Sequence, residues 1–181
     1  MTTRAFIGFS LVLALLQAAA CGSAPTTTPS PSNSVAATPT PNLIDACIVG
    51  AWKSTVGMLP ESYQGAAVTA TGGGGTVLTF NADGSYSGDF AKTQPYIATT
   101  SGGHRISVLA TGAVAGSFTT VGGELSLADT QTTLTVTERV DAKVTSSQAA
   151  SSTSSAEYTC TAETSLVLSS GGFSTRYVPV A

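Results

Sequence analysis

Short runs of alternating apolar and polar residues, separated by glycine-rich turns, fill the chain from Asp45 onward. In the run at 85–90, Tyr86 and Phe90 share one face, and the preceding "NADG" is a strong hairpin signal. No segment shows a 3.6-residue apolar period, and only residues 59–65 are compatible with a single helical turn. The pattern predicts an all-β domain, either a closed up-and-down β-barrel or a two-sheet β-sandwich.

The chain length and the turn signals predict one domain with a single core over residues 45–181. The polar segment 146–156 is predicted as a loop. About ten short strands are predicted, at residues 48–56, 76–81, 85–90, 95–100, 105–110, 113–120, 124–128, 132–144, 157–161, 165–169 and 173–178.

The chain has three cysteines, Cys21, Cys47 and Cys160, so at least one of them lies outside any intramolecular disulfide. Cys47 precedes the first predicted strand and Cys160 lies in the third strand from the end, and export would deliver both to an oxidising compartment. A bridge between them would join the ends of the domain, which favours a closed barrel over a sandwich. The alternative is two buried thiols.

The first twenty residues have the organisation of an export signal. Arg4 is followed by an apolar run at 5–16, which is shorter than the roughly 18 residues of a spanning helix. The stretch "AAAC" resembles the lipobox of bacterial lipoproteins, with Ala18 where leucine is usual. The resemblance implies that Cys21 is lipidated, becomes the first residue of the mature protein and holds it on the extracytoplasmic face of the cell membrane. The alternative is an ordinary secretory signal that leaves Cys21 as a thiol.

Residues 21–44 then form a predicted tether. From Gly22 to Leu43 the segment contains five prolines, many serines and threonines, and no charge. Such a composition cannot bury enough apolar area to offset the entropy of ordering, so an extended spacer is expected. In a polyproline-like state it would reach roughly 70 Å. It is either a bare linker or an O-glycosylated stalk.

A family resemblance lies in the first strand of the domain. "VGAWKSTV" resembles the Gly-x-Trp motif of lipocalins and of the lipocalin-like domains of small actinobacterial lipoproteins, with Gly50 and Trp52 at the motif positions. The later segments "GSFTTVGGELSL" and "YTCTAETSLVLSSGGFSTRYV" are similar to the same group, although the central Thr-Asp-Tyr motif of lipocalins is absent. The resemblance implies a barrel-end tryptophan that stacks on a late-strand arginine, here Arg176.

That resemblance implies a membrane-anchored envelope protein that binds an apolar or amphipathic small molecule without catalysis. A second hypothesis is a structural or protein-interaction module with a filled barrel. A monomer without a cofactor is expected in either case.

Charge and motif content weigh against other functions. Arg4 is the only charged residue of the leader, so the mature chain has six basic and ten acidic residues and no basic surface for nucleic acid. His104 is the only histidine and is predicted to be a solvated turn residue rather than a metal ligand. No Gly-x-Ser-x-Gly elbow is present, and the glycine run 72–75 lacks the ending of a phosphate loop. We therefore expect no catalytic residue and no metal site.

One carboxylate interrupts an apolar face. On the predicted strand at 132–144, Glu138 falls on the face of Leu134, Val136 and Val140. An inward carboxylate is costly unless it is paired, so Glu138 is a candidate ligand-orienting group, with Arg105 or Arg176 as its partner. The alternative is a β-bulge that returns Glu138 to solvent.

Overall fold

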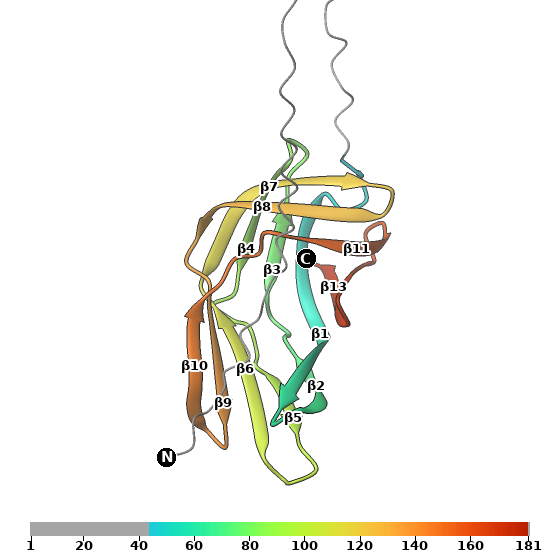
Figure 1. The fold of residues 1–181 in the computed structure, drawn as a ribbon. Helices are drawn as coiled ribbons and strands as arrows, with labels where there is room; N and C mark the ends of the chain where they lie inside the picture. Colours follow the sequence, from blue (N-terminus) through green and yellow to red (C-terminus); the bar gives the residue numbers. More distant parts are fainter. Residues whose placement is uncertain (1–43, 181) are drawn as a thin grey trace, which may run out of the picture. The chain divides into compact units, whose positions relative to one another are not determined.

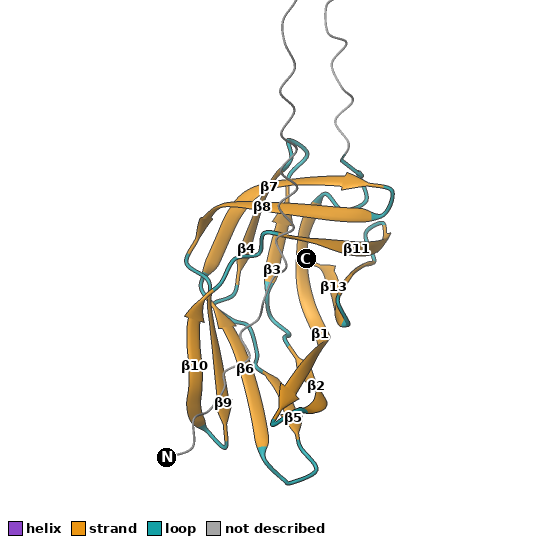
Figure 2. Cartoon of the chain, viewed as in Figure 1, coloured by secondary structure: helices purple, strands orange, loops and turns teal. Residues whose placement is uncertain are grey.

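The computed structural model describes residues 44–180, which form strands and turns without a helix (Figures 1 and 2). The strands are β1 (Gly50–Tyr63), β2 (Ala66–Gly72), β3 (Val77–Phe80), β4 (Ser85–Asp89), β5 (Tyr96–Thr99), β6 (Arg105–Thr111), β7 (Ala113–Val121), β8 (Glu124–Thr132), β9 (Thr135–Val140), β10 (Lys143–Ala149), β11 (Ser154–Thr161), β12 (Ser165–Ser170) and β13 (Phe173–Pro179). The all-β prediction is confirmed, with thirteen strands in the described region rather than about ten.

Eight of these strands close into an antiparallel barrel. In spatial order they are β1, β3, β4, β7, β8, β11, β12 and β13, and β1 pairs with both β3 and β13 to complete the circle. The spatial order repeats the chain order, so the barrel is of the up-and-down type. The lipocalin-like barrel is therefore confirmed, and the sandwich alternative does not apply.

The other five strands enter the chain as three insertions, after β1, after β4 and after β8. In an up-and-down barrel these three connections lie at the same end, so the insertions meet there. They form one sheet in the order β2, β5, β6, β9, β10, which joins the far half of β1. We call this sheet, with residues 57–63 of β1, the annex; it occupies the lower half of Figure 1. The opposite end of the barrel is called the disulfide end.

The annex corrects three local predictions. Residues 59–65 are not a helical turn, because β1 continues to Tyr63 and pairs with β2 as far as Ala66. The segment 132–144 is two strands, because Asp141 and Ala142 turn the chain with positive φ angles of 49° and 68°. Much of the predicted loop 146–156 belongs to β10 and β11. The secondary structure of these regions is determined by pairing between distant segments and not by local propensity.

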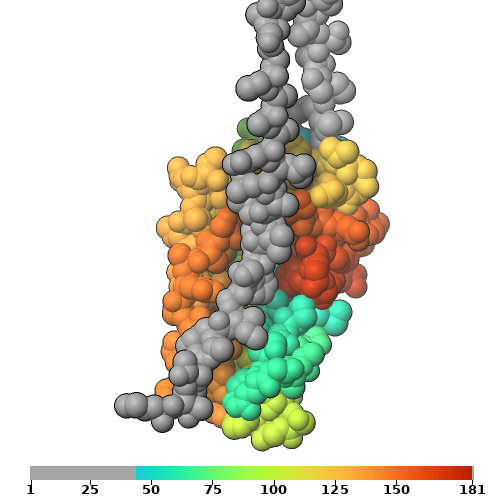
Figure 3. Space-filling view, viewed as in Figure 1, coloured from blue at the N-terminus to red at the C-terminus, as the bar shows by residue number. Residues whose placement is uncertain are grey.

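Two apolar clusters replace the predicted single core. The barrel cluster fills the interior with side chains that are at most 7% exposed. Its members are Ile48, Trp52, Leu78, Phe80, Tyr86, Val114, Phe118, Leu125, Leu134, Leu166, Leu168 and Tyr177. The smaller annex cluster contains Ala70, Ala98, Ile106 and Val108. On the face in Figure 3, β9 and β10 in orange form one flank and β1 and β2 in green the other.

The predicted disulfide between Cys47 and Cys160 is present, with the two Cα atoms 6.1 Å apart. Cys47 precedes β1 and Cys160 lies near the end of β11, so the bridge ties the start of the described region to the closing strands. Two hydrogen bonds fix the same place: the Asp45 N–H donates to Thr120 Oγ1 at 2.7 Å, and the Tyr158 hydroxyl donates to the Asp45 carboxylate at 3.0 Å.

Candidate functional site

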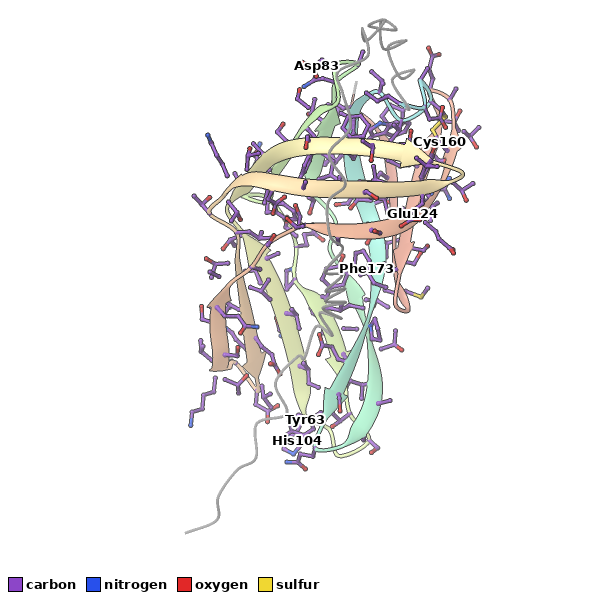
Figure 4. All side chains as sticks on the ribbon, turned by 45° about the horizontal axis from the view of Figure 1, so that its top comes forward. Tyr63, Asp83, His104, Glu124, Cys160 and Phe173 are labelled. Carbon is purple, nitrogen blue, oxygen red and sulfur yellow. A yellow bond between two sulfur atoms is a disulfide. The ribbon has the colours of Figure 1, made fainter. Side chains whose placement is uncertain are left out.

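The candidate site is a groove in the barrel wall, not the barrel interior. It has a volume of about 610 Å³ and is lined by Glu124 of β8, Ser155, Ala156 and Glu157 of β11, and residues 169–174 of β12, β13 and their turn. We call it the wall groove. Figure 4 shows Glu124 and Phe173 on this side of the barrel. The volume is within the range of small-molecule sites.

The wall groove exists because β11 changes partner along its length. Residues 154–157 of β11 pair with β8, whereas residues 157–161 pair with β12. At Glu157, which pairs with both Glu124 and Ser169, the first half of β11 leaves β12 and the wall opens. Side chains of both strands and of the β12–β13 turn therefore border the opening.

A hydrogen-bonded hub around Asp129 holds the segment before β11 against β8. The Asp129 carboxylate accepts hydrogen bonds from the Ser152 N–H at 2.6 Å, from the Ser152 hydroxyl at 2.6 Å and from the Ser151 hydroxyl at 2.9 Å. The Tyr86 hydroxyl, from the barrel core, donates to the same carboxylate. The Asp129 N–H donates in turn to Thr153 Oγ1 at 3.0 Å. The hub thus fixes the direction in which β11 begins.

The hub perturbs the pKa values of both acids in it. Burial alone would raise the pKa of Asp129, but the hydrogen bonds from Ser152, Tyr86 and Ser151 outweigh it and hold that pKa below its usual value. Burial, together with the hydrogen bond to Asp129, raises the pKa of Tyr86 to about 12. Asp129 is therefore a carboxylate at neutral pH, and Tyr86 is a neutral donor.

A β-bulge follows Asp129 in β8, at Thr130. The β7–β8 register shifts between Ala115, which pairs with Gln131, and Gly116, which pairs with Asp129. A Cβ atom at Gly116 would collide with the carbonyl of Ala128, so this position needs glycine. Asp129 itself lies on the inner face by alternation with Leu125 and Leu127, within reach of Tyr86.

The Gly-x-Trp residues lie at the disulfide end, away from the wall groove. Trp52 is 3% exposed and donates from Nε1 to the Ile48 carbonyl at 2.7 Å. Arg176 does not lie where the resemblance implied, because it is exposed on the outer face between the buried Thr175 and Tyr177. Tyr177 is the β13 residue that shares the barrel cluster with Trp52. Gly50 has a φ of 140°, which favours glycine.

Glu138 lies in the annex, on the same face as the half-buried Val136 and Val140. The bulge in this hairpin is in β10, between Val144 and Ser146, and does not turn Glu138 away. Its electrostatic neighbour is Glu61 of β1: burial, and then the charge of Glu138, raise the pKa of Glu61. The expected partners do not fit, because Arg105 and Arg176 are exposed. Glu138 is thus inward but does not line the wall groove.

His104 is an exposed turn residue at the tip of the annex, as predicted. Its Nδ1 lies 2.7 Å from the Asp141 carboxylate, and its ring contacts that of Tyr63, with centroids 5.4 Å apart (Figure 4). This hydrogen bond, and a second from the Arg105 N–H, lower the pKa of Asp141. The contact joins the tips of three separate insertions, which indicates a structural role.

Some predictions concern residues outside the described range. The export signal at 1–20, lipidation of Cys21 and most of the tether at 21–44 fall there. Within residues 44–180, no group of three or more His, Cys, Asp or Glu side chains is placed to hold a metal ion. That same region has no helix long and apolar enough to cross a membrane.

No family model and no curated protein match the chain.

Proposed function

We propose that this protein is a lipid-anchored protein of the cell envelope that binds an amphipathic small molecule, without catalysis, in the wall groove. One observation carries this proposal: the barrel interior is filled by side chains, while the wall beside it opens into a groove of about 610 Å³. Ligand-carrying barrels of eight strands normally hold one small ligand inside. In this chain Trp52, Phe80 and Phe118 occupy that space.

The lining of the wall groove suits an amphipathic molecule. The Phe173 ring supplies an apolar surface and itself contacts the Tyr96 ring of the annex, with centroids 6.3 Å apart. Serine hydroxyls and two carboxylates supply polar contacts on the other walls. Six of the ten lining residues are serine or glutamate, and the apolar side chains are those of Ala156 and Phe173, so the groove suits a ligand with a polar head and an apolar part. The resemblance to small actinobacterial lipoproteins with lipocalin-like domains supports the same class.

A structural or protein-interaction module is the second candidate. The filled barrel favours it, and so does β10, which pairs with β9 on one side and forms one edge of the annex. Unpaired edges can add a strand from another chain. Lys143 and the bulge after Val144 make this edge less regular, as natural edge strands often are.

The wall groove is tested with a neutral fluorescent amphiphile, N-phenyl-1-naphthylamine. Its fluorescence should rise on binding to the chain, and Phe173→Ala should weaken binding by up to about tenfold, because one aromatic contact is lost. Ser155→Trp, which places a ring in the groove from an exposed position, should also weaken it. Fluorescence titration gives both affinities, with circular dichroism as the check on folding.

The control for this titration is Val144→Ala, which changes a side chain that is 51% exposed on β10 of the annex and does not line the wall groove. Its affinity should equal that of the native chain. Equal affinity in Phe173→Ala, Ser155→Trp and the native chain would place the probe elsewhere and overturn groove binding. Absence of binding to a folded native chain would instead favour the interaction module.

The membrane anchor is tested separately at Cys21. In a bacterial host that processes lipoproteins, the chain should take up a radioactive fatty acid and sediment with membranes, whereas Cys21→Ala should lose both the label and the membrane association. Two acyl chains on one residue suffice for stable anchoring. Ser23→Ala is the neighbouring control and should behave as the native chain does. Label retained by Cys21→Ala would refute the anchor.

A further inference from the structure

Two carboxylates lie side by side at the edge of the wall groove. Glu124 of β8 and Glu157 of β11 are register partners, and both lie on the exposed outer face. Directly opposed residues of an antiparallel pair have Cβ atoms about 4.5–5.5 Å apart, and like charges at such positions are destabilising. A strand pair that keeps two glutamates opposed therefore carries a local cost at neutral pH.

No positive charge offsets this pair within the groove. The lining residues include no lysine, arginine or histidine. The ion pair among the described residues joins His104 and Asp141, at the tip of the annex. The wall groove is therefore a concave site with a negative field, and its chemistry is complementary to a cation.

The other residues that line the wall groove can contact a ligand that has an ammonium group and an apolar part. The hydroxyls of Ser155, Ser169, Ser170 and Ser174 can accept N–H donors, and Ser169 donates to Ser174 at 3.3 Å. A cation is also attracted to the face of an aromatic ring such as Phe173. A divalent metal ion fits less well, because hard cations take six or more oxygen ligands and only two carboxylates are present.

We propose that the wall groove binds a protonated alkylamine, with its ammonium between Glu124 and Glu157 and its apolar chain along Phe173. This inference rests on the proposed function and adds the charge of the ligand to it. The ammonium supplies the positive charge that the two carboxylates lack. The alkyl chain of the ligand contacts Phe173, which an inorganic cation would not cover.

The experiment compares three ligands of equal chain length by isothermal titration calorimetry on the full chain. Octylammonium should bind about tenfold more tightly than the neutral octanol, because only the ammonium makes charge-assisted hydrogen bonds to the glutamates. Octanoate should bind most weakly, because its carboxylate is repelled by them. The preference for octylammonium should shrink at high salt.

The double variant E124Q/E157Q should lose the preference for octylammonium and keep its affinity for octanol. Since it removes a repulsion, it should fold at least as well as the native chain, and the single variant E157Q provides a second measurement. Glu163→Gln, at the disulfide end, is the matched control and should leave all three affinities unchanged.

The outcomes separate the two proposals. Equal affinities for octylammonium and octanol, unaffected by E124Q/E157Q but weakened by Phe173→Ala, would overturn the cation preference and keep the groove. A preference for octylammonium that survives in E124Q/E157Q would place the cation site elsewhere and also overturn this inference. No binding of any of the three ligands to the native chain would overturn both proposals.

Discussion

Removing the Cys47–Cys160 disulfide should lower the free energy of unfolding by about 4 to 5 kcal/mol. The bridge spans a sequence separation of 113 residues, and in the chain-entropy model a loop of that length restricts the unfolded chain strongly. The double variant C47A/C160A avoids a leftover thiol at either position. Urea unfolding followed by the fluorescence of Trp52, which is the only tryptophan and is buried, measures the difference.

Two comparisons make this result specific to the bridge. A reductant should destabilise the native chain by a similar amount and should leave C47A/C160A unchanged. The hydrogen bonds of Asp45 to Thr120 and Tyr158 hold the same segment independently of the bridge. A loss below about 1 kcal/mol would mean that these bonds suffice, and the bridge would then contribute little through the unfolded state.

The barrel could be predicted because its signals are local. Alternation in strands such as β4 and β8, the turn residues of "NADG" and the positions of two cysteines each survive in the structure. Trp52 was also predicted at a barrel end, where it packs in the core. The alternation and the turn depend on residues near one another in sequence, whereas the cysteine pairing was predicted from the expected oxidising compartment and the position of Trp52 from the family resemblance.

The annex could not be predicted, because it depends on insertions that meet only in space. Its strand β5 touches β2 at the single register pair Thr71 and Ile97, and no local pattern encodes that pairing. The position of Glu61 was missed for the same reason, since "LPESYQG" has a turn composition and becomes part of a strand only when β2 folds back on it. The inward direction of Glu138 was visible as alternation, but its neighbour was not.

The wall groove was missed because it arises from a change of partner within β11. The sequence 146–156 is rich in serine and has no apolar alternation, so nothing in it indicates a strand that leaves β12 for β8. One signal for the groove was present in the sequence, because Glu124 and Glu157 are acidic residues of neighbouring strands. Neither residue indicates a site by itself. Only the register shows that they are opposed.

Asp129→Ala should destabilise the chain by about 2 to 4 kcal/mol and weaken probe binding in the wall groove. The change removes a charged acceptor that serves the Ser152 backbone, two serine hydroxyls and the buried Tyr86, and these donors are left without it. Freed from β8, the segment at 151–153 no longer sets the direction of β11. Urea unfolding and the N-phenyl-1-naphthylamine titration measure the two effects.

The pH dependence gives this prediction its sharpest test. The pKa of Asp129 is lower in the folded chain than the unfolded value of about 3.9, so its contribution is complete above that value and is lost as the pH falls through the folded pKa. The difference in the free energy of unfolding between the native chain and Asp129→Ala should therefore become smaller as the pH falls. Asp83 is the matched control, because its pKa is also lowered by hydrogen bonds from Ser85, but it lies in an exposed turn outside the hub. If Asp83→Ala weakened probe binding as much as Asp129→Ala, general loss of stability would explain both, and the hub would not be what holds the groove open.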